Sequence, residues 1–132
     1  MSRKTIILGV TGSIAAIKAE DLVKRLRKVA RVIVVMTQAA REFVLPERLA
    51  KVSGNRVVTE LFERYRKEKE TVEHISLAEK AALLLIAPAT ANIISKLANG
   101  IADDMLTTLA LATQSPILIA PAMNTDMWHN SI

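Results

Sequence analysis

Four short runs of apolar residues recur along the chain, and most of the chain between them has helical periodicity. They are Lys4–Val10, Arg31–Met36, Ala82–Ala87 and Pro116–Ala120. Runs that are apolar at almost every position are typical of strands covered on both faces by helices. Strands that alternate with helices along the chain predict an α/β fold with a doubly wound, mainly parallel sheet and right-handed crossovers.

The first two runs enclose a predicted helix from Ser13 to about Ala30. Ser13 is a suitable N-cap, because its hydroxyl can accept a hydrogen bond from an amide of the first turn. We expect an apolar stripe on this helix to face the sheet, with charged residues outside it. The stripe consists of Ile14, Ile17, Leu22, Val23, Leu26 and Val29.

The rest of the chain supplies the other predicted elements. Gly54 and Asn55 indicate a turn, and the charge-rich, aperiodic stretch Phe62–Glu73 is interpreted as a surface helix or loop. We expect the last two apolar runs to be buried strands that end at Pro88 and Pro121. The predicted helices are Ala39–Lys51, interrupted near Pro46, one beginning within Ser76–Lys80, then Thr90–Gly100 and Asp103–Thr113.

Composition limits the chemistry that these elements can carry. The chain has no cysteine, which excludes disulfides, cysteine-ligated zinc and a thiol nucleophile of its own. Two histidines are too few for a zinc site without several carboxylates, so no metal is expected. The net charge of +5 comes from Lys and Arg interleaved with Asp and Glu, and only one Trp, one Tyr and two Phe could stack on bases. This pattern favours solvated helix faces over a nucleic-acid surface.

The sequence shows no membrane span and no export signal. Its longest apolar run, Ala81–Ala87, is far shorter than the roughly 20 residues that a spanning helix needs. The N-terminus also lacks the apolar core of a signal peptide. We therefore expect a cytoplasmic protein without a membrane partner.

The candidate binding residues follow the strands, because ligands of doubly wound sheets bind beyond the strands' carboxyl ends. Gly12 permits a tight turn, and the amides at the start of the Ser13 helix suit an anion such as a phosphate. An ordinary strand-to-helix turn explains the same residues. The loop lacks the GxxxxGK[ST] pattern of nucleoside triphosphate sites, and the second strand ends at Thr37 instead of an acid for a ribose hydroxyl. Thr37 could bind a monophosphate, so a mononucleotide such as FMN is favoured.

Two further strand ends combine a proline with short polar side chains. In Ala87–Asn92 and Ala120–Asn124 the proline ends the strand, and small alanines leave room for a flat ligand. Thr90 and Asn92 are also explained as caps of the next helix. Asn124 stands with Met123, Met127 and Trp128, where an apolar wall and an amide would meet at the mouth of a pocket. His74 precedes a helical segment, and a surface or capping position is its alternative interpretation.

Several of these segments occur together and in order. They are Gly12–Ala16, Thr37 with Ala39, Ala40 and Phe43, His74–Ile75, Ala87–Asn92, KxAxGxxDD from Lys96 to Asp104, and PxMNxxMW from Pro121 to Trp128. Together they resemble the homo-oligomeric flavin-containing cysteine decarboxylases, and within them the phosphopantothenoylcysteine decarboxylase domains of coenzyme A biosynthesis. The resemblance covers essentially the whole chain, and PxMNxxMW and the histidine are its specific features.

The resemblance implies one flavoprotein domain over residues 1–132, with a Rossmann-like fold and FMN as the cofactor. It implies that His74 is the catalytic histidine and that Asn124, with Met127, binds the substrate. That substrate would be 4′-phosphopantothenoylcysteine. Its thiol would be oxidised by the flavin before carbon dioxide leaves, and the product would be 4′-phosphopantetheine. The implied cofactor-binding residues are Gly12, Ser13, Ile14, Thr37, Phe43, Ala89 and Thr90.

The resemblance also implies a homo-oligomer, a trimer or a dodecamer, in which His74 reaches the flavin from a neighbouring subunit. Full-length family members continue past PxMNxxMW into a flap whose cysteine helps to reduce the enethiol intermediate. This chain stops at Ile132, so we expect a C-terminally truncated or split polypeptide whose reaction is incomplete. A phosphopantothenate–cysteine ligase, fused or separate, is the implied partner. A non-catalytic FMN-binding subunit and a flavin prenyltransferase stay open as alternatives.

Overall fold

The computed structural model describes residues 3–59 and 75–132. Four parallel strands form one sheet in the order β2-β1-β3-β4. The chain places β2 on one side of β1 and then returns to place β3 and β4 on the other side. The carboxyl ends of the neighbours β1 and β3 are therefore the switch point of the fold. The strands are β1 (Thr5–Val10), β2 (Arg31–Met36), β3 (Leu83–Ala89) and β4 (Ile117–Pro121).

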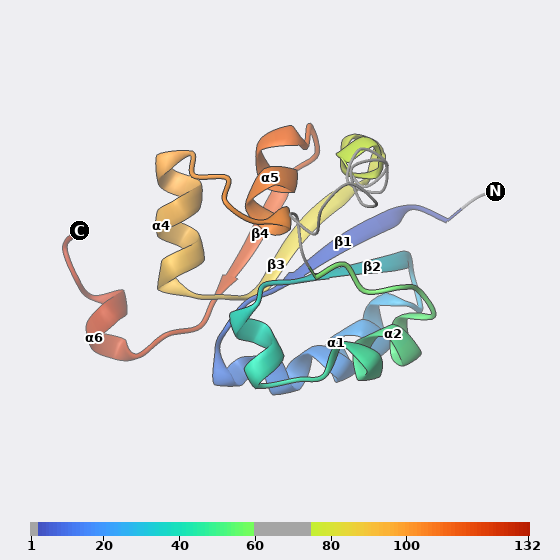
Figure 1. Cartoon of the computed structure of the whole chain (residues 1–132), viewed down its shortest axis with the longest axis horizontal. Helices are drawn as coiled ribbons and strands as arrows, with labels where there is room; N and C mark the ends of the chain where they lie inside the picture. The colour runs from blue at the N-terminus through green and yellow to red at the C-terminus, as the bar shows by residue number, and fades with distance from the viewer. Residues whose placement is uncertain (1–2, 60–74) are drawn as a thin grey trace.

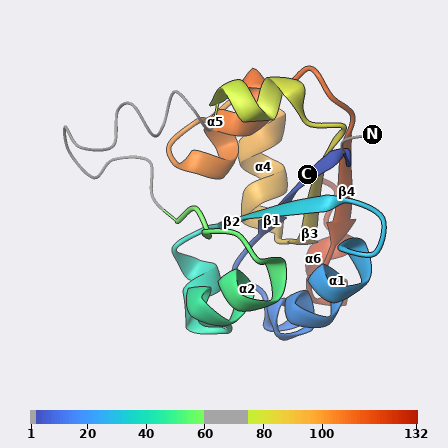
Figure 2. The same cartoon turned by 90° about the vertical axis from the view of Figure 1, so that its right-hand side faces the viewer.

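Helices cover both faces of this sheet, as Figures 1 and 2 show. The arrangement confirms the predicted doubly wound α/β fold. On one face lie the 3-10 helix η1 (Ile14–Lys18), α1 (Ala19–Leu26), the 3-10 helix η2 (Ala39–Glu42) and α2 (Pro46–Ser53). On the other lie a helical segment at residues 75–80, α4 (Ala91–Asn99) and α5 (Met105–Ala112), and a short helix, α6 (Thr125–Trp128), follows β4.

Each face of the sheet has its own apolar core, because successive strand residues point to opposite faces. Ile7 and Ile86 pack on the α4–α5 side, whereas their neighbours Leu8 and Leu85 pack on the α1–α2 side. Burial on both faces explains why β1, β2 and β3 are apolar along most of their length.

The apolar stripe predicted for the first helix is only partly correct. The helix begins as 3-10 with three residues per turn, so its apolar positions are out of phase with the 3.6-residue spacing assumed from the sequence. Ile14 and Ile17 are 72% and 58% exposed, and the exposed Val29 lies beyond the end of α1. The residues that face the core are Ala16, Ala19 and Val23, with Leu22 and Leu26 partly buried.

The last strand is not buried as predicted. β4 is an edge strand of the described sheet and pairs with β3. Its residues Ile117 and Leu118 are 41% and 56% exposed. The apolar run therefore identified a strand correctly but not its degree of burial.

The third strand also differs from its predicted end, because it continues through Pro88 to Ala89. Its pairing with β1 stops at Ile86, and its register against β4 shifts between Ile86 and Ala89. Proline has no amide proton to give to a ladder, so it is tolerated where the regular pairing is interrupted.

The predicted helix boundaries agree with the structure where capping residues mark them. Thr90 is the N-cap of α4, and Gly100 ends this helix at a φ of 69°. Pro46 begins α2, and Gly54 ends it at a φ of 71°. Residues 62–73 and His74 lie outside the described part of the chain. Within the described part, no helix combines the length and the hydropathy that crossing a bilayer requires.

Candidate functional site

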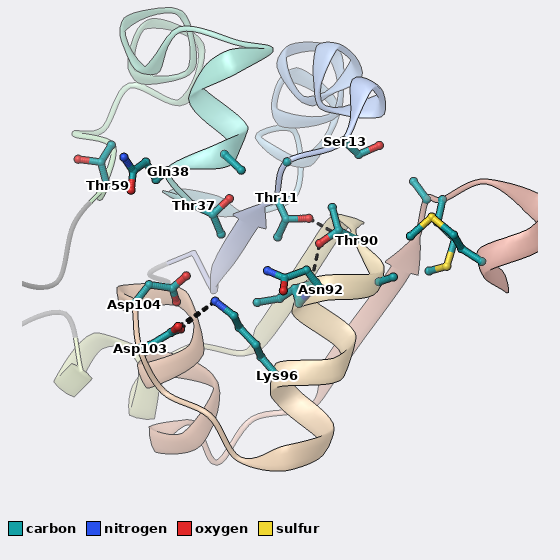
Figure 3. A pocket seen from close by; sticks show the side chains of 17 residues that line it. Thr11, Ser13, Thr37, Gln38, Thr59, Thr90, Asn92, Lys96, Asp103 and Asp104 are labelled. Atoms are coloured by element: carbon teal, nitrogen blue, oxygen red, sulfur yellow. Dashed lines mark hydrogen bonds and ion pairs between the residues drawn. The ribbon is translucent and has the colours of Figure 1, made fainter. Parts of the chain in front are cut away.

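A cleft of about 850 Å³ opens at the carboxyl edge of the sheet and is lined by turns that follow all four strands (Figure 3). Thr11 and Gly12 follow β1, Thr37 follows β2, Thr90 follows β3 and Met123 follows β4. This is the edge at which the sequence predicted a ligand, and the cleft has the size of sites that hold cofactors.

Gly12 lies where the turn after β1 touches the turn after β2. A β-carbon on Gly12 would approach Ala39 much more closely than real atoms do. The glycines with positive φ in the described chain are Gly54 and Gly100, so Gly12 does not serve a left-handed turn. The tight turn expected at Gly12 is present, because the Ser13 amide donates to the Thr11 carbonyl oxygen at 2.9 Å. The structure adds a second role, the close approach of this turn to Ala39.

Three hydroxyl groups at this edge accept hydrogen bonds from amides at the starts of the helices that follow them, and two of the three, those of Ser13 and Thr90, belong to N-cap residues. Ser13, Thr37 and Thr90 each accept a hydrogen bond from a backbone amide two or three residues further along the chain, at 3.1, 3.3 and 3.1 Å. The capping interpretation of Thr90 is therefore confirmed. A hydroxyl has one proton and two lone pairs, so capping leaves its proton available to donate. The cleft thus offers hydroxyl donors, which suit a phosphate or another anion.

Asn124 plays a similar double role beside the cleft. Its side-chain oxygen accepts hydrogen bonds from the amides of Asp126 and Met127 at 2.8 and 3.2 Å and so caps α6. The side-chain nitrogen keeps its two protons for a ligand. Met123 and Met127 line the cleft, whereas Asn124, which lies between them in sequence, is not part of its lining.

The wall opposite the Ser13 turn carries charged groups that the sequence interpretation left without a role. Lys96 Nζ lies 3.0 and 2.9 Å from the two carboxylate oxygens of Asp103. Gly100 turns the chain between them, so residues seven apart in sequence meet. Asp104 Oδ1 accepts from the amide and hydroxyl of Thr107 at 2.8 and 2.7 Å and caps α5. Both residues of the DD pair are therefore engaged in the fold of this wall.

The structure gathers most, but not all, of the predicted site residues. Gly12, Ser13, Thr37, Thr90 and Met127 line the cleft. Ala89 is fully buried beside Thr90, whereas Ile14 and Phe43 are exposed and lie outside the lining formed by this chain. His74 is outside the described residues. Asn92 and Met123, which the sequence placed at candidate strand ends, line the cleft as well. The lining residues without a predicted ligand role are Thr11, Gln38, Ala39, Thr59, Ala91, Ile93, Lys96, Asp103, Asp104 and Ala122.

A signal for some of these residues was present in the sequence. Thr11 directly follows the first strand, and Lys96, Asp103 and Asp104 form the KxAxGxxDD pattern. Position after a strand identifies Thr11 as close to the ligand edge. Thr59 is more than twenty residues beyond the end of β2, and nothing in the local pattern shows that it lines the same cleft.

The strand order and the donor-lined cleft at the β1–β3 switch point define a class of α/β proteins that bind a mononucleotide at this place. Flavodoxin-like folds, which share this strand order, hold FMN there. The family model described as Flavoprotein matches residues 1–132. The chain belongs to this family of FMN-binding decarboxylases, which confirms the predicted family, fold and cofactor.

The chain is similar to bifunctional coenzyme A biosynthesis proteins called CoaBC. It is 46% identical to the Haemophilus influenzae protein over 133 residues and 43% identical to the Escherichia coli protein over 130 residues. These alignments cover 100% and 98% of the chain but 33% and 32% of the relatives. The chain thus spans about one third of the length of these CoaBC relatives.

Solved structures show the same similarity. The FMN-dependent cysteine decarboxylase SpaF superimposes with a TM-score of 0.85 at 36% identity, covering 99% of this chain and 74% of SpaF. A phosphopantothenoylcysteine (PPC) decarboxylase carrying a C175S substitution, complexed with pantothenoylaminoethenethiol, superimposes with a TM-score of 0.82 at 33% identity. That match covers 97% of this chain and 71% of the decarboxylase.

Proposed function

We propose that this chain carries out the FMN-dependent decarboxylation of 4′-phosphopantothenoylcysteine to 4′-phosphopantetheine. The observation that carries the proposal is the convergence of Gly12, Ser13, Thr37 and Thr90 on one cleft that also receives Met127. The similarity to CoaBC proteins and to a PPC decarboxylase supports the choice of substrate within the family.

The residues of the cleft fit FMN in both shape and chemistry. The hydroxyl oxygens of Ser13 and Thr37 accept from backbone amides and keep their protons for a ligand, and Gly12 keeps their two turns in contact. We assign the phosphate of FMN to this end of the cleft. Met123 and Met127 supply polarisable apolar surface suited to a flat ring. The proposed cofactor site also includes Thr90 and Ala89. We assign Ile14 and Phe43 to it as well, through contacts that form when the oligomer assembles.

When bound, FMN supplies the acceptor for a hydride from the carbon that bears the substrate thiol. The thiol proton is lost in the same oxidation, and the resulting thiocarbonyl can accept the electron pair that carbon dioxide leaves behind. The complete reaction is redox-neutral, since the two electrons must be returned to the enethiol to give the saturated product. The protein positions the reactants and holds the substrate carboxylate for its departure.

We assign the substrate carboxylate to the side-chain nitrogen of Asn124. The oxygen of this amide accepts the hydrogen bonds that cap α6, which fixes the orientation of the amide group. Its NH2 group therefore points away from the start of α6. A neutral donor orients a carboxylate without the strong ion pair that would oppose its loss as carbon dioxide. We assign proton transfer to His74, which would reach the site from a neighbouring subunit. Imidazole suits this role because it changes charge near neutral pH.

The proposed assembly is a homo-oligomer, a trimer or a dodecamer. Ile14, Ile17 and Trp128 are each more than half exposed, and an interface between copies would bury such apolar side chains. A cytoplasmic location and a phosphopantothenate–cysteine ligase, fused or separate, complete the proposal. The ligase rests on the bifunctional CoaBC relatives.

The decisive experiment incubates the FMN-loaded chain with 4′-phosphopantothenoylcysteine and analyses the products by mass spectrometry. Release of carbon dioxide with 4′-phosphopantetheine supports the full proposal. Carbon dioxide with accumulated enethiol supports the oxidative half alone, because this chain has no cysteine to assist the final reduction. Bound FMN with unchanged substrate favours a non-catalytic subunit. Prenylation of the flavin by dimethylallyl phosphate would instead indicate a prenyltransferase.

A further inference from the structure

We propose that Thr11 is a positioning residue that sets the spacing of the cleft at the switch point and so determines how well the cleft holds a flavin phosphate. This inference rests on the proposed assignment of FMN to the Gly12–Ser13 turn. Thr11 precedes that turn directly and is 1% exposed.

The side chain of Thr11 joins the ends of β1 and β3. Its hydroxyl donates to the carbonyl oxygen of Pro88 at 2.6 Å and accepts from the amide of Thr90 at 3.0 Å (Figure 3 shows the contact with Thr90). The Thr11 amide also donates to the Pro88 oxygen at 3.3 Å. One buried residue therefore makes three hydrogen bonds that join the turn after β1 to the end of β3 and to Thr90, which follows it.

These bonds occur where the regular sheet no longer connects the two strands. The β1–β3 ladder ends at the pair Gly9 and Ile86, and Pro88 has no amide proton with which to continue it. The helix after β1 packs on one face of the sheet and α4 packs on the other. The two strand ends diverge into helices on opposite faces, so the hydroxyl of Thr11 provides a link that neither helix supplies.

The link extends from Thr11 to the other groups proposed to contact ligands. On one side Thr11 leads into Gly12 and Ser13. On the other side it holds the amide of Thr90, whose own hydroxyl caps α4. The neighbouring Ala89 oxygen accepts from the Ala122 amide at 3.0 Å, which ties the turn before Asn124 to the same unit. A change at Thr11 should therefore alter the distance between the phosphate turn and the other turns of the cleft.

The test compares Thr11→Val with Thr113→Val, which is a matched control outside the cleft. The hydroxyl of Thr113 also donates to a carbonyl, that of Ala78 at 3.1 Å, and accepts from an amide, that of Ser115 at 3.2 Å. Each valine removes one hydrogen bond that the hydroxyl donates and one that it accepts, with little change of side-chain shape. Both variants should therefore lose stability. FMN and riboflavin dissociation constants are measured for both by quenching of flavin fluorescence. Riboflavin lacks the phosphate and reports on the rest of the cleft.

We expect Thr11→Val to weaken FMN binding by about tenfold, in line with the loss of one or two hydrogen bonds, while riboflavin binding changes much less. Thr113→Val should leave both constants near wild type, and Thr11→Ser, which keeps the hydroxyl, should restore FMN binding. If Thr11→Val does not fold, Thr11→Ala and Thr113→Ala provide the same comparison.

Equal losses of FMN and riboflavin affinity in Thr11→Val would overturn the inference, because they would show a purely structural role. Unchanged FMN affinity in Thr11→Val would overturn it as well. In both cases the proposed function survives, provided that the wild-type chain binds FMN. A wild-type chain without FMN affinity would overturn the proposed function together with this inference.

Discussion

Gly12 and Ala39 belong to turns that follow different strands, and a β-carbon built on Gly12 would lie 2.4 Å from the β-carbon of Ala39. The two turns can touch only because residue 12 has no side chain. Through this contact Ser13 and Thr37 reach the same cleft, where both present hydroxyl groups. The contact leads directly to a test of the phosphate end of the site.

Gly12→Ala should destabilise the fold by about 1–3 kcal/mol, the usual cost of forcing an extra methyl group into packed structure. It should also lower the amount of FMN that copurifies, because Ser13 and Thr37 are pushed apart. Urea unfolding and the flavin absorbance of the purified protein measure the two effects. The double variant Gly12→Ala with Ala39→Gly exchanges the methyl group across the contact and should recover much of both losses. Wild-type stability and FMN content in Gly12→Ala would contradict this account.

Asn124→Asp should retain FMN yet lose carbon dioxide release. A carboxylate oxygen can still cap α6, so the local fold should persist, whereas the amide protons are gone and a negative charge faces the substrate carboxylate. Repulsion at a partly screened site costs on the order of 1–4 kcal/mol of substrate affinity. Carbon dioxide release and flavin absorbance are measured side by side. Asn124→Ala separates the two roles, since it removes the cap as well, and wild-type turnover in Asn124→Asp would refute the carboxylate assignment.

Asp104→Ala should reduce the free energy of unfolding by about 0.5–2 kcal/mol, because α5 loses its N-cap. The hydroxyl of Thr107, which is fully buried, would lose its acceptor at 2.7 Å and keep only the carbonyl oxygen of residue 104 at 3.2 Å. Asp104→Asn keeps a side-chain oxygen for the Thr107 amide and should remain closer to wild type. Chemical denaturation of the three proteins provides the comparison, and equal stability of the alanine and asparagine variants would show that the capping box contributes little.

His74→Asn should abolish decarboxylation while FMN remains bound, as the proposed proton-transfer role requires. His129, the other histidine of the chain, is exposed at the end of α6 and offers a control. His129→Asn should retain turnover. Turnover and flavin content are compared at several pH values for both variants. Normal activity in His74→Asn would remove this residue from the mechanism.

The purified protein should have a mass three or twelve times that of the 14.4 kDa chain. Multi-angle light scattering at micromolar concentration measures this mass directly. Substituting the exposed Ile14 and Ile17 with serine should shift the protein towards monomer with little loss of core packing. A monomeric wild-type protein would contradict the proposed assembly and any role of His74 across subunits.

Much of this fold could be predicted because its signals are local. The apolar runs of β1, β2 and β3 report burial on both faces, and helix caps such as Thr90 are recognised within a few residues of sequence. The position of the cleft also followed from the sequence, since parallel strands bring their carboxyl ends to one edge. The exposed β4 shows the limit of this reasoning: an apolar run has the same appearance in a central strand and at the edge.

By itself the sequence determined the class of fold, the edge that carries the site and the family to which the chain belongs. The tertiary structure decided which groups meet there. Thr11 forms hydrogen bonds with Pro88 and Thr90, which are 77 and 79 positions further along the chain. Ala39 leaves no room for a side chain at Gly12, and Lys96 forms an ion pair with Asp103 across a turn. Periodicity and capping depend on neighbours along the chain and can be detected locally. Close approach and hydrogen-bond partnership between distant segments depend on how helices and strands pack, and no local pattern contains that information.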